Sequence, residues 1–137
     1  MDAPGASVDR EVCPFCGRIA RGDVLRRGGV AASFPDGYPL TDGHTLVVPV
    51  RHVAALDDLG GEEFIAMWRA VRREMGRLRR ELSPDGFNIG VNVGASAGQT
   101  VDHAHVHLIP RYHGDVADPR GGVRCVVPHK ARYWEAP

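Results

Sequence analysis

The sequence predicts an α+β fold, in which one long helix packs on an antiparallel β-sheet. The first observation is helical periodicity, because apolar side chains recur at spacings of four and three over residues 64–82. The second is a set of short apolar and β-branched runs at 24–34, 44–49, 87–93 and 100–109, separated by turn residues. A single long helix among several strands favours hairpins over repeated parallel βαβ units.

The N-terminal runs predict a hairpin followed by a third strand. Residues 24–25 and 30–34 read as two strands, with Arg-Gly-Gly at 27–29 in the turn between them. The following loop is rich in Pro, Asp and Gly. Residues 44–49 then form a β-branched strand.

The predicted helix is the clearest element of the chain. A loop at 57–61 begins it, and Ser83-Pro84-Asp85-Gly86 ends it. Arginines cover its other face, which we interpret as solvated. Six residues make up its apolar stripe: Phe64, Trp68, Val71, Met75, Leu78 and Leu82.

The chain has 137 residues, which fits one domain. We expect a flexible tail at 1–11, a domain at 12–111 and a C-terminal extension of that domain at 112–137. Lys and Arg together number 17, as do Asp and Glu, so nothing demands a nucleic-acid or membrane partner. No apolar run has membrane-spanning length and the first residues do not resemble a signal peptide, so we expect a cytoplasmic protein.

Three histidines alternate with apolar residues at 103–107. On a strand, His103, His105 and His107 share one face and lie about 6–7 Å apart. A single histidine often serves only packing, but strict alternation indicates a site. Two chemistries fit: three imidazoles can hold one metal ion that activates water, or one imidazole can attack phosphorus.

The loop before this strand favours phosphorus chemistry. Residues 92–100 are rich in small and neutral polar side chains, whose N–H and O–H groups suit phosphate oxygens. Carboxylates, which are common in open metal sites, are scarce there, since only Asp102 is near.

The segment His-Ala-His-Val-His-Leu-Ile at 103–109 resembles the signature of the histidine triad (HIT) family. The resemblance extends to the loop ending Gly-Gln-Thr at 98–100, and to the block from Phe34-Pro35-Asp36 through Gly-His-Thr-Leu-Val-Val-Pro to His52. It covers residues 12–111 and implies the HIT fold. It also implies nucleotide hydrolysis or transfer at an α-phosphate through a covalent nucleotidyl-histidine, releasing a nucleoside monophosphate.

The resemblance implies a role for each matching residue. His105 is the expected nucleophile, His107 lies beside the transferred phosphate, His44 supports the triad and Thr100 assists the leaving group. Asp36 is expected to hold the ribose hydroxyls, although an Asp before Gly is also common in turns. The remaining expected substrate contacts are Asn92, Ser96, Gly98 and Gln99 near the phosphate, with Phe15 and Phe34 against the base.

Cys13 and Cys16 form a Cys-x-x-Cys pair, which by itself fits a redox pair, half of a metal site or free thiols. No strand precedes it, which disfavours the redox interpretation. The resemblance implies that His52 and His103 complete a structural zinc site, and no organic cofactor is expected. Cys125 stands alone in an apolar run, which we interpret as a strand.

The resemblance also implies a homodimer acting on a small nucleotide substrate, and nucleic acid is not an expected partner. Arg111, Arg120 and Arg124 either bind distal phosphates or belong to a solvated tail. Two other functions stay open: a metal-dependent hydrolase with the three histidines as ligands, and a non-catalytic nucleotide-binding or adaptor protein. The leaving group and the base preference are not encoded in any recognisable motif.

Overall fold

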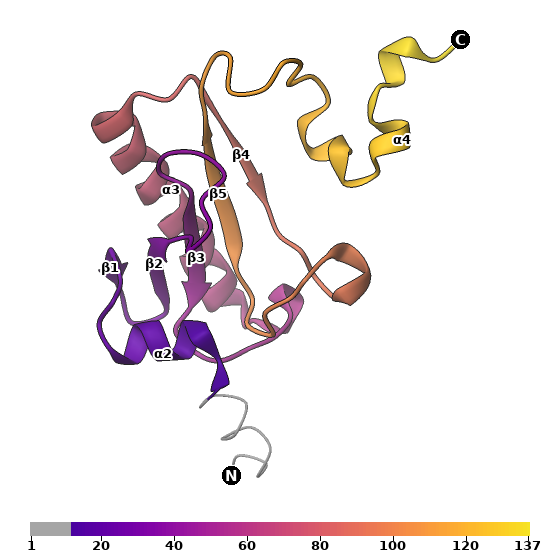
Figure 1. The fold of residues 1–137 in the computed structure, drawn as a ribbon. Coiled ribbons are helices and arrows are strands. Elements are labelled where there is room, and N and C mark those ends of the chain that lie inside the picture. The colour runs from indigo at the N-terminus through magenta and orange to yellow at the C-terminus, as the bar shows by residue number, and fades with distance from the viewer. Residues whose placement is uncertain (1–11) are drawn as a thin grey trace.

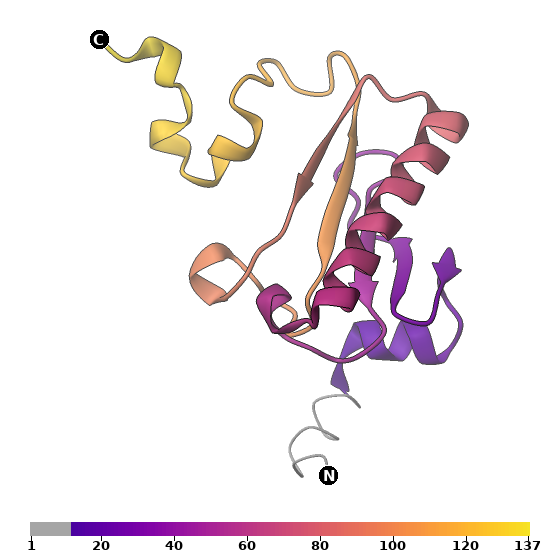
Figure 2. The ribbon, with the colours of Figure 1, turned by 180° about the vertical axis from the view of Figure 1, so that it is seen from behind.

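The computed structural model describes residues 12–137, so the expected tail at 1–11 lies outside the described residues. It confirms an antiparallel five-stranded sheet of order β1-β2-β3-β5-β4 with one long helix, α3, on one face (Figures 1 and 2). The strands are β1 (Arg26–Arg27), β2 (Ala31–Pro35), β3 (Thr45–Pro49), β4 (Gly86–Gly90) and β5 (Val106–Arg111). The helices are α2 (Pro14–Ala20), α3 (Gly61–Leu82) and α4 (Pro128–Ala131), with 3-10 turns η1 (Leu56–Asp58), η2 (Ala95–Ala97), η3 (Gly122–Val126) and η4 (Tyr133–Glu135).

The two faces of the sheet carry two separate apolar clusters, because side chains alternate along each strand. One cluster joins α3 to the sheet and includes Val47, Met67, Val71 and Val106. The other lies on the opposite face, where α2 packs over Phe34 and neighbouring strand residues. The histidines lie on this second face.

Helix α3 matches its predicted range, but its buried face differs from the predicted stripe. Phe64, Trp68 and Leu82 are 37 to 40 % exposed, whereas Glu74 is only 4 % exposed. Ser33 Oγ donates a hydrogen bond to Glu74 Oε1 at 2.6 Å, and Arg77 donates to the other carboxylate oxygen. These partners satisfy the buried carboxyl group, so a polar residue occupies a core-facing position.

Gly43 allows the β2–β3 connection to approach the end of α3. Its φ is +89°, and a Cβ built there would lie 2.7 Å from Leu82 Cδ1 and 2.8 Å from Leu78 Cδ2. Only glycine fits this contact without displacing the helix. The close approach sets the path of the chain immediately before His44.

The strand predicted at 100–109 begins later than expected, since β5 starts only at Val106. Its pairing with β3 stops at Val106 and Val47, two residues before β3 itself ends at Pro49. Ala104 N–H instead donates to Val53 O at 2.6 Å, which ties the segment to the chain beyond β3. The strand predicted at 87–93 likewise ends at Gly90, so Asn92 lies outside it.

The C-terminal extension leads away from the sheet as a series of short turns (Figure 1). Cys125 is exposed and lies in η3, so the prediction of a strand there was wrong. Trp134 packs on Gly121 and under the guanidinium groups of Arg120 and Arg132. The extension is therefore held together by local contacts.

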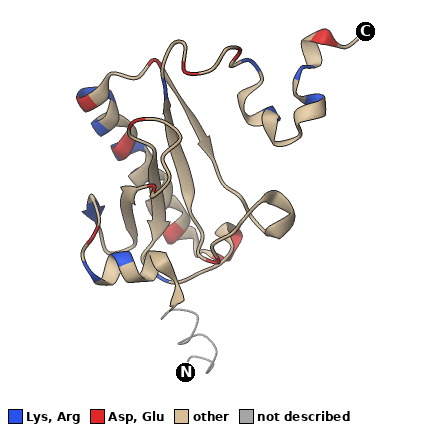
Figure 3. Ribbon diagram, in the orientation of Figure 1, with Lys and Arg blue, Asp and Glu red and all other residues tan. Residues whose placement is uncertain are grey.

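Each arginine that was considered for distal phosphates has partners within the described residues. Arg111 pairs with Asp115 and donates to Asn88, and Arg120 pairs with Asp118. Arg124 donates to two backbone carbonyls of α4. Charged residues are spread over α2, α3, β1 and the extension (Figure 3), and no helix within residues 12–137 is long and apolar enough to cross a bilayer.

Candidate active site and metal cluster

The histidines gather where β3 and β5 lie side by side. Leu46 of β3 is the register partner of His107 of β5, so His44 lies diagonally across from His107 on the same face of the sheet. The His105 and His107 rings are 5.0 Å apart between centroids. His105 lies just before β5 and is 6 % exposed, whereas the His107 side chain is 24 % exposed.

A backbone carbonyl fixes the proton of the His105 ring. Nδ1 of His105 lies 2.8 Å from the carbonyl oxygen of His103. A carbonyl oxygen only accepts, so the proton of the neutral ring is on Nδ1 and Nε2 carries the lone pair. Nε2 has no hydrogen-bond partner within residues 12–137. The ring therefore offers a free nucleophilic nitrogen.

A second hydrogen-bond chain fixes the proton of His107 in the opposite sense. Leu40 N–H donates to His44 Nδ1 at 3.1 Å, so the His44 proton is on Nε2. His44 Nε2 donates in turn to His107 Nδ1 at 3.0 Å. His107 therefore carries its proton on Nε2, where it is a hydrogen-bond donor for a bound oxyanion.

Asp36 approaches this histidine pair from the end of β2. Its Oδ2 lies 3.5 Å from His44 Nε2 and 3.8 Å from His107 Nδ1, while Oδ1 accepts from Tyr38 N–H at 2.7 Å. Asp36, His44 and His107 also form a compact donor group within 4.8 Å. A hollow of about 220 Å³ adjoins Asp36 and His44.

Burial keeps these rings neutral near pH 7. Removal from water lowers the pKa of His107 to about 4, with His105 and His44 acting in the same direction and Asp36 opposing them. Burial also lowers the pKa of His44, again against the pull of Asp36. Neutral His44 and His107 rings preserve the alternating donor and acceptor pattern that the chain from Leu40 to His107 requires.

The Cys-x-x-Cys pair lies in a second cluster beside the triad. Four donor atoms, Cys13 Sγ, Cys16 Sγ, His52 Nδ1 and His103 Nδ1, all lie within 4.8 Å of one another. The nitrogens are 3.2 Å apart, and three nitrogen–sulfur distances are 3.3, 3.4 and 3.5 Å. Ordinary Zn–N and Zn–S bonds in a tetrahedron imply edges of about 3.3 and 3.5 Å, so the donor set fits zinc.

His103 is oriented to be a metal ligand. Its Nε2 lies 2.8 Å from Pro49 O, so the proton of the neutral ring is on Nε2 and the Nδ1 lone pair faces the thiols. Burial lowers the pKa of this fully buried ring to about 4. Cys13, at the N-cap of α2, is also buried, and Cys16 lies one turn further along the helix. With four protein donors, the cluster has the composition of a closed structural site.

A family model described as the HIT domain matches residues 23–114. The chain belongs to the HIT family. An uncharacterized HIT-like protein of Methanocaldococcus jannaschii is 38 % identical over 108 residues, covering 76 % of this chain and 82 % of its own length.

Two named enzymes match a shorter stretch. The bis(5'-nucleosyl)-tetraphosphatase of Schizosaccharomyces pombe is 38 % identical and the AP-4-A phosphorylase of Mycobacterium tuberculosis is 37 % identical, each over 95 residues and 69 % of this chain. The chain spans about half the length of each enzyme, 52 % and 49 % respectively.

Solved HIT structures share the fold. A HIT family protein of Bacillus anthracis is 36 % identical, with 77 % of each chain covered and a TM-score of 0.69. A Zn-bound histidine triad family protein of Mycobacterium smegmatis is 32 % identical, covering 93 % of this chain and 99 % of its own, with a TM-score of 0.70.

Phe15 and Phe34, which were expected to contact the nucleotide base, differ in their position relative to His105. Phe15 packs edge-on against His105, with centroids 5.1 Å apart, and against Phe34 at 5.3 Å. Phe34 has no exposed surface, and the Arg18 guanidinium lies 4.3 Å above its ring centroid. Phe15 therefore lies next to His105, whereas Phe34 is fully buried behind Phe15.

The expected phosphate loop of the HIT family is stabilised by Gln99. Its Oε1 accepts from Gly94 N–H, and its Nε2 donates to the carbonyls of Ala54 and Val101. No triad histidine has a hydrogen bond to this loop within residues 12–137. The other four expected contacts are at or near the surface: Asn92, Ser96, Gly98 and Thr100.

Three groups that orient the histidines were missed by sequence reasoning. They are the backbone N–H of Leu40 and the backbone carbonyls of Pro49 and His103. Every residue except proline has both groups, so no residue type indicates which of them contacts a ring. Only the path of the folded chain identifies them.

Proposed function

We propose that this chain cleaves nucleotides at the α-phosphate by covalent catalysis through His105. His105 Nε2 attacks phosphorus and the bond to the leaving group breaks, so the nucleotidyl group is held on the ring. Water then attacks the same phosphorus, the phosphorus–nitrogen bond breaks, and a nucleoside monophosphate leaves while His105 recovers its neutral form. Two easier displacements replace one difficult displacement.

The observation that carries this proposal is the opposite protonation of the two neighbouring rings. His105 has its lone pair on Nε2, and His107 has its proton on Nε2. One ring can thus attack while the other donates to a phosphate oxygen, where negative charge grows in the transition state. His44 and the Leu40 N–H hold His107 in the donating form.

The proposal is tested with full-length protein and adenosine 5'-phosphoramidate, followed by release of AMP. His105→Gln is expected to lower kcat by about 10⁴-fold or more, as for other nucleophile replacements. A matched control is His113→Gln, because His113 is 92 % exposed and pairs with Asp85, outside the histidine cluster. Acid-labile label that appears on residue 105 in a quenched reaction supports the step, whereas substantial turnover by His105→Gln contradicts it.

The family and its two named relatives support nucleotide hydrolysis in general. One is named as a hydrolase and the other as a phosphorylase, and both reactions can pass through the same nucleotidyl-histidine. Water or inorganic phosphate would then be the second nucleophile. A comparison of turnover with and without added phosphate, using a dinucleoside polyphosphate, separates these outcomes.

We further propose that Cys13, Cys16, His52 and His103 hold a structural zinc ion. When bound, zinc would join α2 to the segment before β5 and keep the thiols as thiolates. About one zinc per chain is expected by elemental analysis, and Cys16→Ser is expected to lose the metal and lower the melting temperature. Cys125→Ser, which changes an exposed cysteine elsewhere, is the matched control.

The arrangement of donors disfavours the alternative of one metal held by all three triad histidines. Within residues 12–137, His103 groups with the thiols, and His107 groups with His44 and Asp36. A non-catalytic nucleotide-binding or adaptor role would be supported instead by tight AMP binding without turnover of any substrate in a broad screen.

We propose that the chain forms a homodimer through the β4 edge of the sheet and exposed apolar side chains near the start of α3. Strand β4 is an edge strand, and Phe64, Ile65 and Trp68 of α3 are 37 to 52 % exposed. Light scattering is expected to give twice the chain mass of 14.9 kDa, and Ile65→Arg is expected to shift it towards the monomer. A wild-type monomer at micromolar concentration contradicts this.

A further inference from the structure

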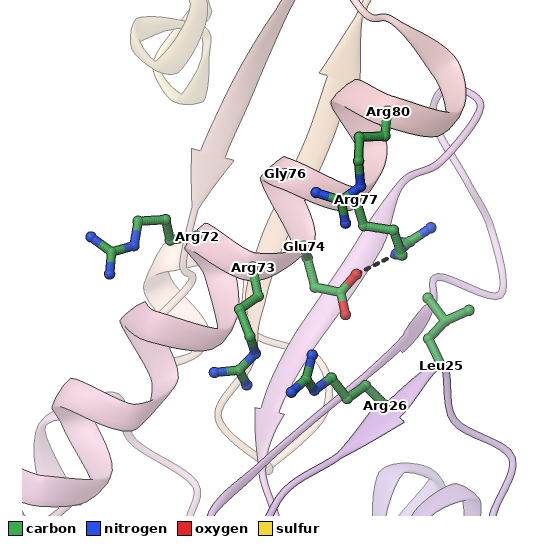
Figure 4. Close-up of a pocket in the computed structure, with 8 residues that line it drawn as sticks. All are labelled: Leu25, Arg26, Arg72, Arg73, Glu74, Gly76, Arg77 and Arg80. Carbon is green, nitrogen blue, oxygen red and sulfur yellow. Dashed lines mark hydrogen bonds and ion pairs between the residues drawn. The ribbon is translucent and has the colours of Figure 1, made fainter.

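A second hollow, of about 520 Å³, lies between β1 and α3, on the face of the sheet opposite the histidines. Its size is typical of a site for a small molecule. Its lining is predominantly cationic (Figure 4), with Leu25, Glu74 and Gly76 as the other contributors. The five arginines of its lining are Arg26, Arg72, Arg73, Arg77 and Arg80.

The sequence and the topology together bring these arginines into one place. Arg26 pairs in register with Ser33, and Ser33 faces α3 through its bond to Glu74. Arg26 therefore points towards the helix. Arg73, Arg77 and Arg80 follow one another at helical spacing along the facing side of α3, and Figure 4 shows them around Glu74, with Arg72 directed away.

The one carboxylate in the hollow pairs with Arg77 and leaves the charge of the other four arginines uncompensated by it. Both oxygens of Glu74 are already used, one by Ser33 Oγ and one by Arg77. Arg77 also bonds to Glu81 and to Thr45 Oγ1. Arg26, Arg73 and Arg80 have no hydrogen bond or ion pair through their side chains to any residue in 12–137.

We propose that this hollow binds a small polyphosphate anion, at a site separate from the histidines. Guanidinium groups match phosphate oxygens with paired N–H donors and stay charged at any physiological pH. Several converging guanidinium groups repel one another, and an anion among them removes that repulsion.

The lining also indicates what part of a ligand would be recognised. Leu25 is its only apolar side chain and it has no aromatic ring, so nothing there offers a stacking surface for a base. A chain of phosphates fits this chemistry, either as an inorganic oligophosphate or as the phosphate tail of a nucleotide. A single hollow without aromatic side chains is a poor match for a nucleic-acid strand.

The hollow adjoins the one beside the histidine pair. Leu25 and Arg77 line both hollows, and the smaller one also contains Asp36 and His44. Arg77 donates to Thr45, the residue after His44. A polyanion bound to the arginines would therefore lie next to the β2–β3 connection while leaving the opposite face free for substrate.

The test is calorimetric titration of the full-length protein with sodium tripolyphosphate at 150 mM salt. The double variant Arg26→Gln with Arg73→Gln is expected to weaken binding at least tenfold. The matched control, Arg27→Gln with Arg79→Gln, removes the same charge from the same two elements and is expected to change binding less than twofold. Arg27 pairs with Ala32 on the other face, and Arg79 lies over Phe87.

Side-chain Nε–H signals in NMR spectra locate the bound anion. Shifts of the Arg26 and Arg73 signals are expected, and they are expected to be absent with AMP. If ATP binds with the same dependence on Arg26 and Arg73, the ligand class includes nucleotides bound by their phosphate tails. If only tripolyphosphate binds in this way, the ligand is an inorganic oligophosphate.

Three results would overturn the proposal. The first is equal weakening in both double variants, and the second is tripolyphosphate binding no tighter than sulfate at equal ionic strength. The third is tighter binding of a 20-base-pair DNA duplex than of tripolyphosphate, with the same dependence on Arg26 and Arg73.

Discussion

The proposed metal cluster and the proposed catalytic cluster use the same residue type in opposite orientations. His103 gives its Nε2 proton to the Pro49 carbonyl and turns Nδ1 towards the thiols. His105 gives its Nδ1 proton to the His103 carbonyl and leaves Nε2 free. Two positions apart, identical side chains thus acquire different chemistry because different ring nitrogens meet a backbone carbonyl.

The largest expected difference between the clusters concerns stability. His103→Gln removes a proposed zinc ligand and is expected to lower the free energy of unfolding by about 3–5 kcal/mol, with loss of the metal. His105→Gln is expected to keep the metal and to change the melting temperature little. Chemical denaturation and elemental analysis of both variants check this. Loss of zinc from His105→Gln would show that the clusters are not separable.

The next effect concerns the close contact between Gly43, which precedes His44, and the end of α3. Gly43→Ala places a Cβ within 2.8 Å of two leucine methyl groups at a φ of +89°. We expect a loss of about 2–4 kcal/mol, measured by denaturant unfolding, because both strain and overpacking oppose the side chain. Gly37→Ala is the control, since a Cβ there meets nothing within 4 Å. Similar losses in both variants would contradict the close-contact explanation.

A smaller effect is expected from breaking the hydrogen-bond chain behind His107. His44→Asn shortens the donor that reaches His107 Nδ1, so His107 no longer has a fixed tautomer. We expect kcat to fall by about 10- to 100-fold, which is about 1.4–2.8 kcal/mol, with little change in KM. Nitrogen chemical shifts of His107 report the tautomer directly. An unchanged His107 tautomer together with normal kcat would remove His44 from this role.

The smallest effect concerns pH. The pKa of His107 is lowered to about 4 in the folded chain, against 6.5 in the unfolded one, because burial disfavours the charged ring. Below pH 6.5 the unfolded state therefore binds more protons, so stability falls as the pH drops from 6.5 to 4 and is constant above that window. The full shift corresponds to an upper value of about 3 kcal/mol, and partial exposure reduces it to about 1–2 kcal/mol.

The measurement compares wild type with His107→Gln by denaturant unfolding at pH 7 and pH 4.5. Acid release of a bound metal affects both proteins equally, so the difference between them isolates His107. The wild type is expected to lose more stability than the variant over this interval. Equal losses would place the His107 pKa near its ordinary value.

The sequence predicted the fold class and the range of α3, because helical periodicity sustained over residues 64–82 is a strong local signal. It did not predict the burial of Glu74, since the hydroxyl that accommodates this carboxyl group comes from Ser33, 41 residues away. Nor did it predict the start of β5, which lies where the pairing with the partner strand β3 stops, at Val106 and Val47. Local patterns identify elements, whereas distant partners decide their limits.

The candidate site divides in the same way. Residue types and spacing singled out these histidines and cysteines as candidates, and the structure brings His44 to His107 and both thiols to His52 and His103. The structure also shows Phe34 without exposed surface and Gln99 bonded within its own loop. Sequence patterns identify chemical groups but do not show which way a side chain faces.

One residue links the two clusters, because His103 contributes its ring to one and its backbone carbonyl oxygen to the other. The carbonyl is present whatever side chain residue 103 carries. A homologue with other residues in place of the two cysteines and His103 would therefore keep the backbone hydrogen bond that orients His105, provided that its main chain follows the same path. The proposed metal site can thus be replaced during evolution while the orientation of His105 is kept.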